Sequence, residues 1–165
     1  MLNFPVEKPY DYELVQAMWT LERFPSELLP DVAAEAMVEG YDGPAVLALV
    51  SFHPPRLDGI DRAMEAAMRE MGRPPVPQAK AAWLVARHLA KLVVTGKLDA
   101  RDWCQEMGDY WWNARNAPEG SDLGKLQGLE LSYDEDLADR EVTYRDMTEE
   151  ARAFATRSCP SGPSR

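Results

Sequence analysis

A chain of 165 residues, 45% of them hydrophobic and 28% charged, is typical of one folded domain and is too apolar for a disordered chain. Its 18 basic and 28 acidic residues give a net charge of −10. That balance argues against nucleic acid and against anionic lipid as partners, because both are bound by basic surfaces. It suits a basic protein partner, which the charge would attract over a distance.

The N-terminus lacks the basic stretch and the apolar stretch of a signal peptide, and no run approaches the length of a membrane span. We therefore expect a cytoplasmic protein. Two cysteines are too few for a disulfide framework. Cys104 falls in a helical pattern with no neighbouring histidine or second cysteine, so we expect it to be a buried hydrophobic residue.

The first forty residues predict an extended arm and two helices. Residues 1–10 carry two prolines and are expected to be extended. Asp11 is placed to cap a helix that ends before Pro25. A second helix begins near Ser26, and Gly40 is the residue expected just beyond its end.

The pattern from residue 28 to residue 50 resembles one found in small, uncharacterised, all-helical bacterial proteins. The resemblance implies an all-α fold and a bacterial setting, and it carries no activity or site. Its residues are Leu28, Leu29, Pro30, Ala33, Ala36, Gly40, Tyr41, Asp42, Gly43, Pro44, Leu47, Leu49 and Val50.

The middle of the chain predicts the clearest helices. A short, almost wholly apolar stretch follows Pro44 and should be buried, and a further helix is expected over 58–71. Asp99 is placed to cap a helix that carries Trp103 and Trp111. The strongest pattern lies between these, where residues at 3, 1, 3, 3, 1, 3 spacing form a stripe that faces the core; they are Ala79, Ala82, Trp83, Ala86, Leu89, Ala90 and Val93.

The C-terminal part differs from the rest of the chain in composition and in the strength of its helix signals. Residues 119–146 are acidic and predict a loop-rich segment, in which Gly124 and Gly128 weaken any helix. Thr148 is expected to cap a last short helix, and residues 158–165 are expected to be disordered. With no alternating strand pattern, the sequence predicts an all-α fold, an irregular bundle of about six to eight helices in a single domain over 1–157.

Charge is distributed unevenly along the chain. Between Glu119 and Glu150 there are eleven acidic and three basic residues, whereas 73–101 has a net charge of +5. Two interpretations stay open. The acidic segment either docks a basic partner, through Asp134, Glu135, Asp136 and Asp139, or folds back on the basic face of the helix expected over 79–95. For the charges alone we favour the second, structural interpretation, or one in which the acidic side chains are simply solvated.

An aromatic group at 103–112 is the most unusual feature of the sequence. Trp103, Tyr110 and Trp111 can share a helix face, whereas Trp112 points elsewhere. Because aromatic residues and arginine dominate interface hot spots, Tyr110, Trp112 and Arg115 form a candidate contact patch. The alternative is that these aromatic residues belong to the core.

No catalytic or metal-binding motif is present in the sequence. His88 has no metal-ligand partner at helical spacing, and His53 precedes two prolines. Phosphate-binding and nucleophile-elbow motifs are lacking, and the acidic run fits the calcium loop poorly. We therefore expect no catalytic residue, no cofactor and no metal.

The sequence thus favours a non-catalytic protein-interaction module. In its most concrete form this is an acidic immunity or antitoxin-like protein that neutralises a basic partner. One alternative is an enzyme or small-ligand protein with an interhelical pocket that uses His88 or His53 with a carboxylate. Another is a structural subunit that associates with itself.

Overall fold

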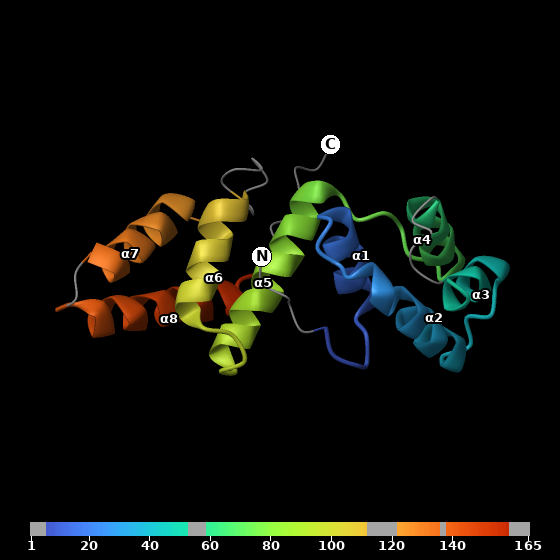
Figure 1. Cartoon of the computed structure of the whole chain (residues 1–165), viewed down its shortest axis with the longest axis horizontal. Coiled ribbons are helices and arrows are strands. Elements are labelled where there is room, and N and C mark those ends of the chain that lie inside the picture. The colour runs from blue at the N-terminus through green and yellow to red at the C-terminus, as the bar shows by residue number, and fades with distance from the viewer. Residues whose placement is uncertain (1–5, 53–58, 112–121, 136–137, 159–165) are drawn as a thin grey trace. The chain divides into compact units, whose positions relative to one another are not determined.

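The computed structural model describes residues 6–52, 59–111, 122–135 and 138–158, with only the main chain described at Asp109 and Tyr110 (Figure 1). These residues are helical and contain no strand, which confirms the all-α fold. The α-helices in the described ranges are α1 (Tyr12–Thr20), α2 (Leu29–Val38), α3 (Pro44–Val50), α4 (Ile60–Glu70), α5 (Gln78–Val94), α6 (Ala100–Glu106), α7 (Leu123–Glu135) and α8 (Arg140–Thr156). A 3₁₀ turn, Ser26–Leu28, precedes α2, and a π-helical turn, Met107–Trp111, follows α6.

The chain divides into two compact units. The N-terminal unit, up to Pro77, holds α1 to α4, and the C-terminal unit, from Gln78, holds α5 to α8. Each unit is described by itself below. The single domain expected over residues 1–157 stays a prediction. None of the described helices combines the length and the apolar character that crossing a membrane would need.

Helix starts follow the capping residues that the sequence predicts. The Asp11 carboxylate accepts hydrogen bonds from the main-chain N–H groups of Glu13 and Leu14, at 3.0 and 3.3 Å. The Asp99 carboxylate likewise accepts a hydrogen bond from the main-chain N–H of Arg101, at 2.8 Å. Such bonds satisfy N–H groups that have no partner inside the helix.

Four helices end in the same main-chain turn. After α2, α4 and α5 a glycine with positive φ stands just beyond the last turn: Gly40, Gly72 and Gly96. The residue after each glycine donates back to a carbonyl five positions earlier, as Tyr41 does to Ala36 at 2.9 Å. At the end of α1 the same position is held by Glu22, with φ 56°, and Arg23 donates to the Met18 carbonyl at 2.7 Å.

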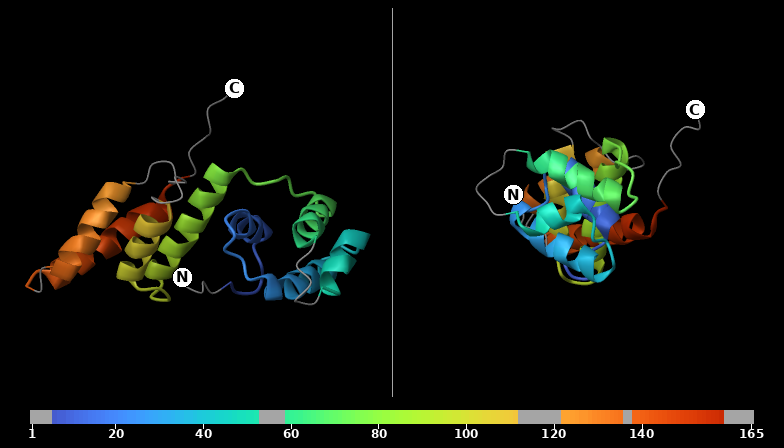
Figure 2. Two further views of the ribbon diagram at one scale, coloured as in Figure 1. Left: turned by 45° about the horizontal axis from the view of Figure 1, so that its top comes forward. Right: turned by 90° about the vertical axis from the view of Figure 1, so that its right-hand side faces the viewer.

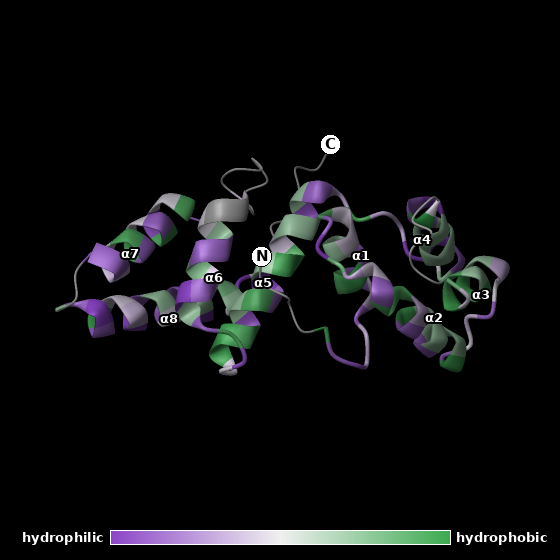
Figure 3. Cartoon of the chain, in the orientation of Figure 1, coloured by the Kyte–Doolittle hydropathy of each residue, from purple (hydrophilic) through white to green (hydrophobic). Residues whose placement is uncertain are grey.

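In the C-terminal unit, α5 packs along α8, and α6 and α7 also pack against α8. The Trp103 indole of α6 is fully buried, donates to the Ala86 carbonyl of α5 at 3.4 Å and lies 6.2 Å from the Phe154 ring of α8. The predicted stripe of α5 is buried except for Ala79, which is exposed at the first turn. Val85 and Leu92 are buried as well, so α5 buries more residues than the predicted stripe contains. Figure 3 shows hydrophobic residues, in green, along α5.

In the N-terminal unit, α2 packs on α3, and α3 packs on α4. The apolar stretch after Pro44 is helix α3, and Val46 and Leu49 are buried as expected. The carboxylate of Glu70, the last residue of α4, accepts hydrogen bonds from the N–H groups of Ala45 and Val46, at 2.9–3.0 Å. An acidic side chain from a neighbouring helix therefore caps α3.

The acidic part of the chain is more helical than the sequence predicts. Residues expected to be loop-rich form α7 and the first turns of α8. Thr148 does not cap a helix: it lies inside α8, where its hydroxyl donates to the Tyr144 carbonyl at 2.9 Å. The prediction was wrong because tertiary packing of Leu123, Leu126 and Met147 outweighs the weak local helix signal of Gly124 and Gly128. The predicted tail lies outside the described residues from Cys159 onward.

Candidate functional site

The ends of α7 and α8 that are joined by residues 136–139 form the candidate site. The two helices lie side by side in both views of the C-terminal unit (Figures 1 and 2), and they pack against each other. The last residues of α7 are therefore close to the first turns of α8. We call this surface the α7–α8 tip; it comprises Leu131, Asp134, Glu135, Asp139, Glu141, Val142 and Tyr144.

Large apolar side chains are exposed at the α7–α8 tip. Leu131 is 60% exposed, Val142 46% and Tyr144 37%. Each lies on a helix whose inner face is already buried, through Leu126 on α7 and Met147 on α8. A single exposed leucine is ordinary, whereas several at one end of a helix pair, among charged residues, are typical of a contact surface.

Carboxylates accompany these apolar side chains. Glu135 ends α7, Asp139 immediately precedes α8, and Glu141 lies in its first turn; all three are exposed. Asp134 is more restrained, because its carboxylate lies 2.8 Å from the guanidinium of Arg101 on α6. The tip thus combines one paired carboxylate with several that face solvent.

Tyr133 and two arginines fix the conformation of the tip. The guanidinium groups of Arg101 and Arg140 each lie 5.3 Å from the centre of the Tyr133 ring. Arg140 also donates from Nε to the Tyr133 carbonyl at 2.9 Å, and the Tyr144 ring lies 6.4 Å from the Tyr133 ring. These contacts join α6, α7 and α8, so the tip is positioned by three helices.

Tyr144 connects the tip to the start of α6. Its hydroxyl donates to the Asp99 carboxylate at 3.0 Å. Burial raises the pKa of Tyr144, and the hydrogen bond to Asp99 raises it further, so the phenol stays neutral and keeps donating. Tyr144 also lines two shallow hollows, one of about 420 Å³ with Glu141 and Val142, and one of about 350 Å³ with Leu98 and Asp99.

The structure brings together three of the predicted contact residues: Asp134, Glu135 and Asp139. Trp112, Arg115 and Asp136 lie outside the described residues, as does the side chain of Tyr110, so the aromatic patch stays a prediction. The apolar members of the tip were missed. Apolar residues at helical spacing ordinarily indicate core, and no local signal in the sequence separates Val142 and Tyr144 from buried positions.

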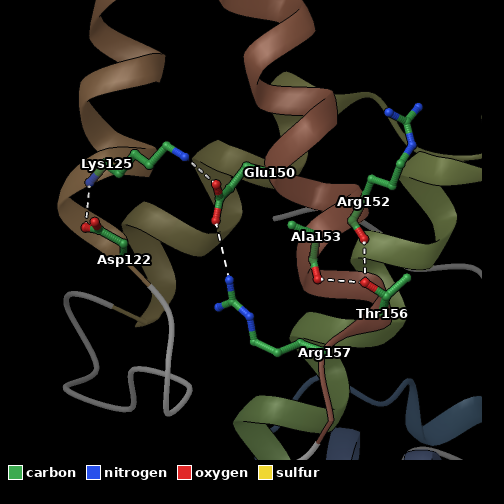
Figure 4. A network of polar contacts seen from close by, with 7 residues as sticks. All are labelled: Asp122, Lys125, Glu150, Arg152, Ala153, Thr156 and Arg157. Carbon is green, nitrogen blue, oxygen red and sulfur yellow. Dashed lines mark hydrogen bonds and ion pairs between the residues drawn. The ribbon is translucent and has the colours of Figure 1, made fainter.

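The described ion pairs of the acidic segment are made with cations outside the basic face expected on α5. Glu150 lies between Lys125 of α7 and Arg157 beyond the end of α8 (Figure 4), with Arg157 at 4.0 Å. Arg87 of α5 instead donates to the main-chain carbonyl of Ala155 at 3.2 Å and lies over the Trp83 ring. The acidic helices are therefore held partly by their own arginine and lysine residues.

The groups considered for chemistry lie apart from the tip. Burial raises the pKa of the Cys104 thiol to about 12, which keeps it protonated and unreactive. His88 is half-buried on α5 and lines neither hollow at the tip, and His53 lies outside the described residues. Within the described residues, no three His, Cys, Asp or Glu side chains are grouped so that they could hold a metal ion.

A scan of the chain against protein-family models finds no match, and searches of curated proteins and of solved structures find no similar chain.

Proposed function

We propose that the protein is a non-catalytic interaction module whose α7–α8 tip docks a basic protein partner. The observation that carries the proposal is the exposure of Leu131, Val142 and Tyr144 among the carboxylates of the tip. Protein interfaces commonly have this composition, with an apolar centre that excludes water and a polar rim that sets the partner's charge.

Binding would proceed in two steps. The net charge of −10, concentrated in the segment from Glu119 to Glu150, attracts a basic partner and raises the rate of encounter. The partner then covers the exposed apolar side chains, which supplies most of the affinity. Tyr133 and its two arginines hold the tip in one conformation beforehand, so little freedom is lost on binding.

The most concrete form of this proposal is an immunity or antitoxin-like protein that neutralises a basic partner by covering its working surface. A basic toxin whose own site binds an anionic substrate would offer the required charge. The proposal also includes Tyr110, Trp112 and Arg115 as contacts, by their residue types.

The experiment is quantitative affinity capture from the native host, with matched pairs of variants. One variant removes apolar surface at the tip, Leu131→Ser with Val142→Ser. Its control removes similar surface from the N-terminal unit, Val38→Ser with Leu47→Ser, where both side chains are also exposed. We expect the wild type and the control to retain one basic protein, which the tip variant loses.

A second pair of variants tests the charge of the tip. Glu135→Gln with Asp139→Asn neutralises the tip, and Glu27→Gln with Asp42→Asn neutralises two exposed carboxylates elsewhere. Only the first pair should weaken capture, and raising the salt concentration should weaken it for every variant. The proposal fails if both pairs behave alike, if no protein is retained, or if the retained protein is a second copy of this chain.

A further inference from the structure

A hollow of about 710 Å³ lies in the N-terminal unit between α1 and α4, and the chain after α4 borders it. Its volume is in the range of sites that hold small ligands or a few residues of peptide, about 300–1,000 Å³. Met64 and Met68 of α4 line it and are buried, and Trp19 of α1 contributes a half-buried indole. Methionine side chains adapt to varied ligands, and an indole face attracts cations.

Charged residues of both signs line the hollow. Asp61, Glu65 and Arg69 follow one another at four-residue intervals on α4, so they share one face of the helix. Neither Asp61 nor Glu65 makes an ion pair within the described parts of the chain. Their separation from Arg69 along the helix axis is about 6 Å for Glu65 and about 12 Å for Asp61.

The two signs are ordered along α4, with Asp61 and Glu65 before Arg69. The guanidinium of Arg73, which follows α4, lies 5.6 Å from the ring of Tyr12, the first residue of α1. The start of α1 is therefore near the chain that follows α4, and Glu22, just beyond the end of α1, also lines the hollow. We call the part of the hollow beside Asp61 and Glu65 its acidic end, and the part beside Arg69 and Arg73 its basic end.

We propose that this hollow binds a peptide that ends in lysine. The lysine ammonium would lie at the acidic end and the free α-carboxylate at the basic end, with the aliphatic stem along Met64 and Met68. An extended lysine spans about 7 Å between these two groups, from bond lengths of about 1.5 Å, which fits the spacing of Glu65 and Arg69. A purely anionic or purely cationic ligand would leave one end of the hollow unmatched.

The proposal goes beyond the docking surface proposed above, because the hollow shares no residue with the α7–α8 tip. It therefore concerns a second partner segment, or a second contact with the same partner. Either way the recognised group is a chain terminus with a lysine side chain.

The test uses the full chain and an N-acetylated tetrapeptide of three alanines followed by a carboxy-terminal lysine. Two matched peptides remove one charge each: the same peptide with a carboxy-terminal amide, and one with norleucine in place of lysine. Binding is followed by two-dimensional NMR, in which the Trp19 indole N–H reports directly on the hollow. We expect saturable binding of the first peptide and about three- to tenfold weaker binding of each of the others.

Variants of the protein should reproduce these losses separately. Asp61→Asn with Glu65→Gln should weaken the lysine peptide by about three- to tenfold and leave the norleucine peptide unchanged. Arg69→Gln should reduce the difference between the free acid and the amide, because Arg73 is then the remaining cation at the basic end. Glu27→Gln with Arg62→Gln, exposed and outside the hollow, should change nothing. Equal binding of acid and amide, no saturable binding, or equal losses in the control variant would overturn the proposal.

Discussion

The carboxylate of Glu70 lies directly against Gly43, in the space that a Cβ atom at residue 43 would occupy. From there it accepts hydrogen bonds from Ala45 and Val46 at the start of α3. The absence of a side chain at residue 43 is therefore what lets the last residue of α4 cap α3. The φ of Gly43 is −66°, which any residue adopts, so the glycine is needed for space and not for its backbone freedom.

This relationship predicts a strongly non-additive pair of substitutions. Gly43→Ala should lower the free energy of unfolding by about 1 kcal/mol, because the new methyl group displaces the cap. Glu70→Ala should cost a similar amount. With Glu70 already replaced, Gly43→Ala should be neutral or slightly stabilising, since alanine restricts the unfolded chain. A double-mutant cycle from urea unfolding measures the coupling.

The control for this cycle is Glu65→Ala. This substitution removes another carboxylate of α4, one that does not cap a helix. Its free energy of unfolding should stay within about 0.5 kcal/mol of the wild type. If Gly43→Ala lowers the free energy of unfolding by the same amount in the wild type and in the Glu70→Ala variant, the glycine is not needed to make room for the cap.

Alkaline pH should destabilise the protein through Cys104. Burial raises the pKa of this thiol from 9.0 to about 12, so the unfolded chain ionises it at a lower pH than the folded chain does. Its contribution is therefore fully present below pH 9 and is lost as the pH rises toward 12. At pH 10 the loss is on the order of 1 kcal/mol relative to pH 7.

The measurement is urea unfolding between pH 7 and pH 10, with Cys104→Ala as the comparison. The variant should begin with a lower stability, from the lost packing, but should show a smaller decrease with pH. Tyr12, whose pKa burial raises to about 12, contributes to the remaining alkaline loss, as do Tyr10 and Tyr144, whose pKa values burial also raises. Parallel pH curves for the variant and the wild type would contradict the assignment to Cys104.

How far the sequence predicts the fold depends on the type of signal. Capping aspartates and terminal glycines act within a few residues, so Asp11, Asp99 and Gly40 were identified correctly. Trp103 and Trp111 were identified as candidates for the core from their spacing, and both are buried. The end of α1 was missed, because nothing local marks Glu22 as a residue with positive φ.

Long-range contacts explain the rest of what was missed. Helix α7 has few buried residues and two glycines, and it depends on packing against α8. The cap that Glu70 provides to α3 joins residues 25 positions apart, which no local pattern reveals. The same holds for the candidate site: its acidic residues stand out in the sequence, whereas the exposure of Val142 and Tyr144 follows only from which face of α8 packs inward.

Two tryptophans should respond in opposite ways to truncation. Trp103 is fully buried against Phe154, so Trp103→Ala should lower the free energy of unfolding by about 3–5 kcal/mol. Trp112→Ala should weaken capture of the basic partner without a comparable loss of stability, as expected of an interface anchor. Thermal unfolding and affinity capture of both variants decide this. A loss of several kcal/mol at Trp112 would assign that residue to the core and remove it from the proposed contacts.

Replacing Glu22 with glycine should stabilise the protein. Glu22 adopts φ 56° at a helix end where Gly40, Gly72 and Gly96 hold the equivalent positions after other helices. An L-residue in this conformation costs about 1 kcal/mol, which glycine avoids, so Glu22→Gly should raise the free energy of unfolding by about that amount. The reverse change, Gly40→Ala, should lower it by about 1 kcal/mol, and nothing lies within 4 Å of the added methyl group to complicate the comparison. Urea unfolding of both variants measures the pair. If Glu22→Gly is instead destabilising, a contact of the Glu22 side chain stabilises the folded protein by more than the backbone strain costs.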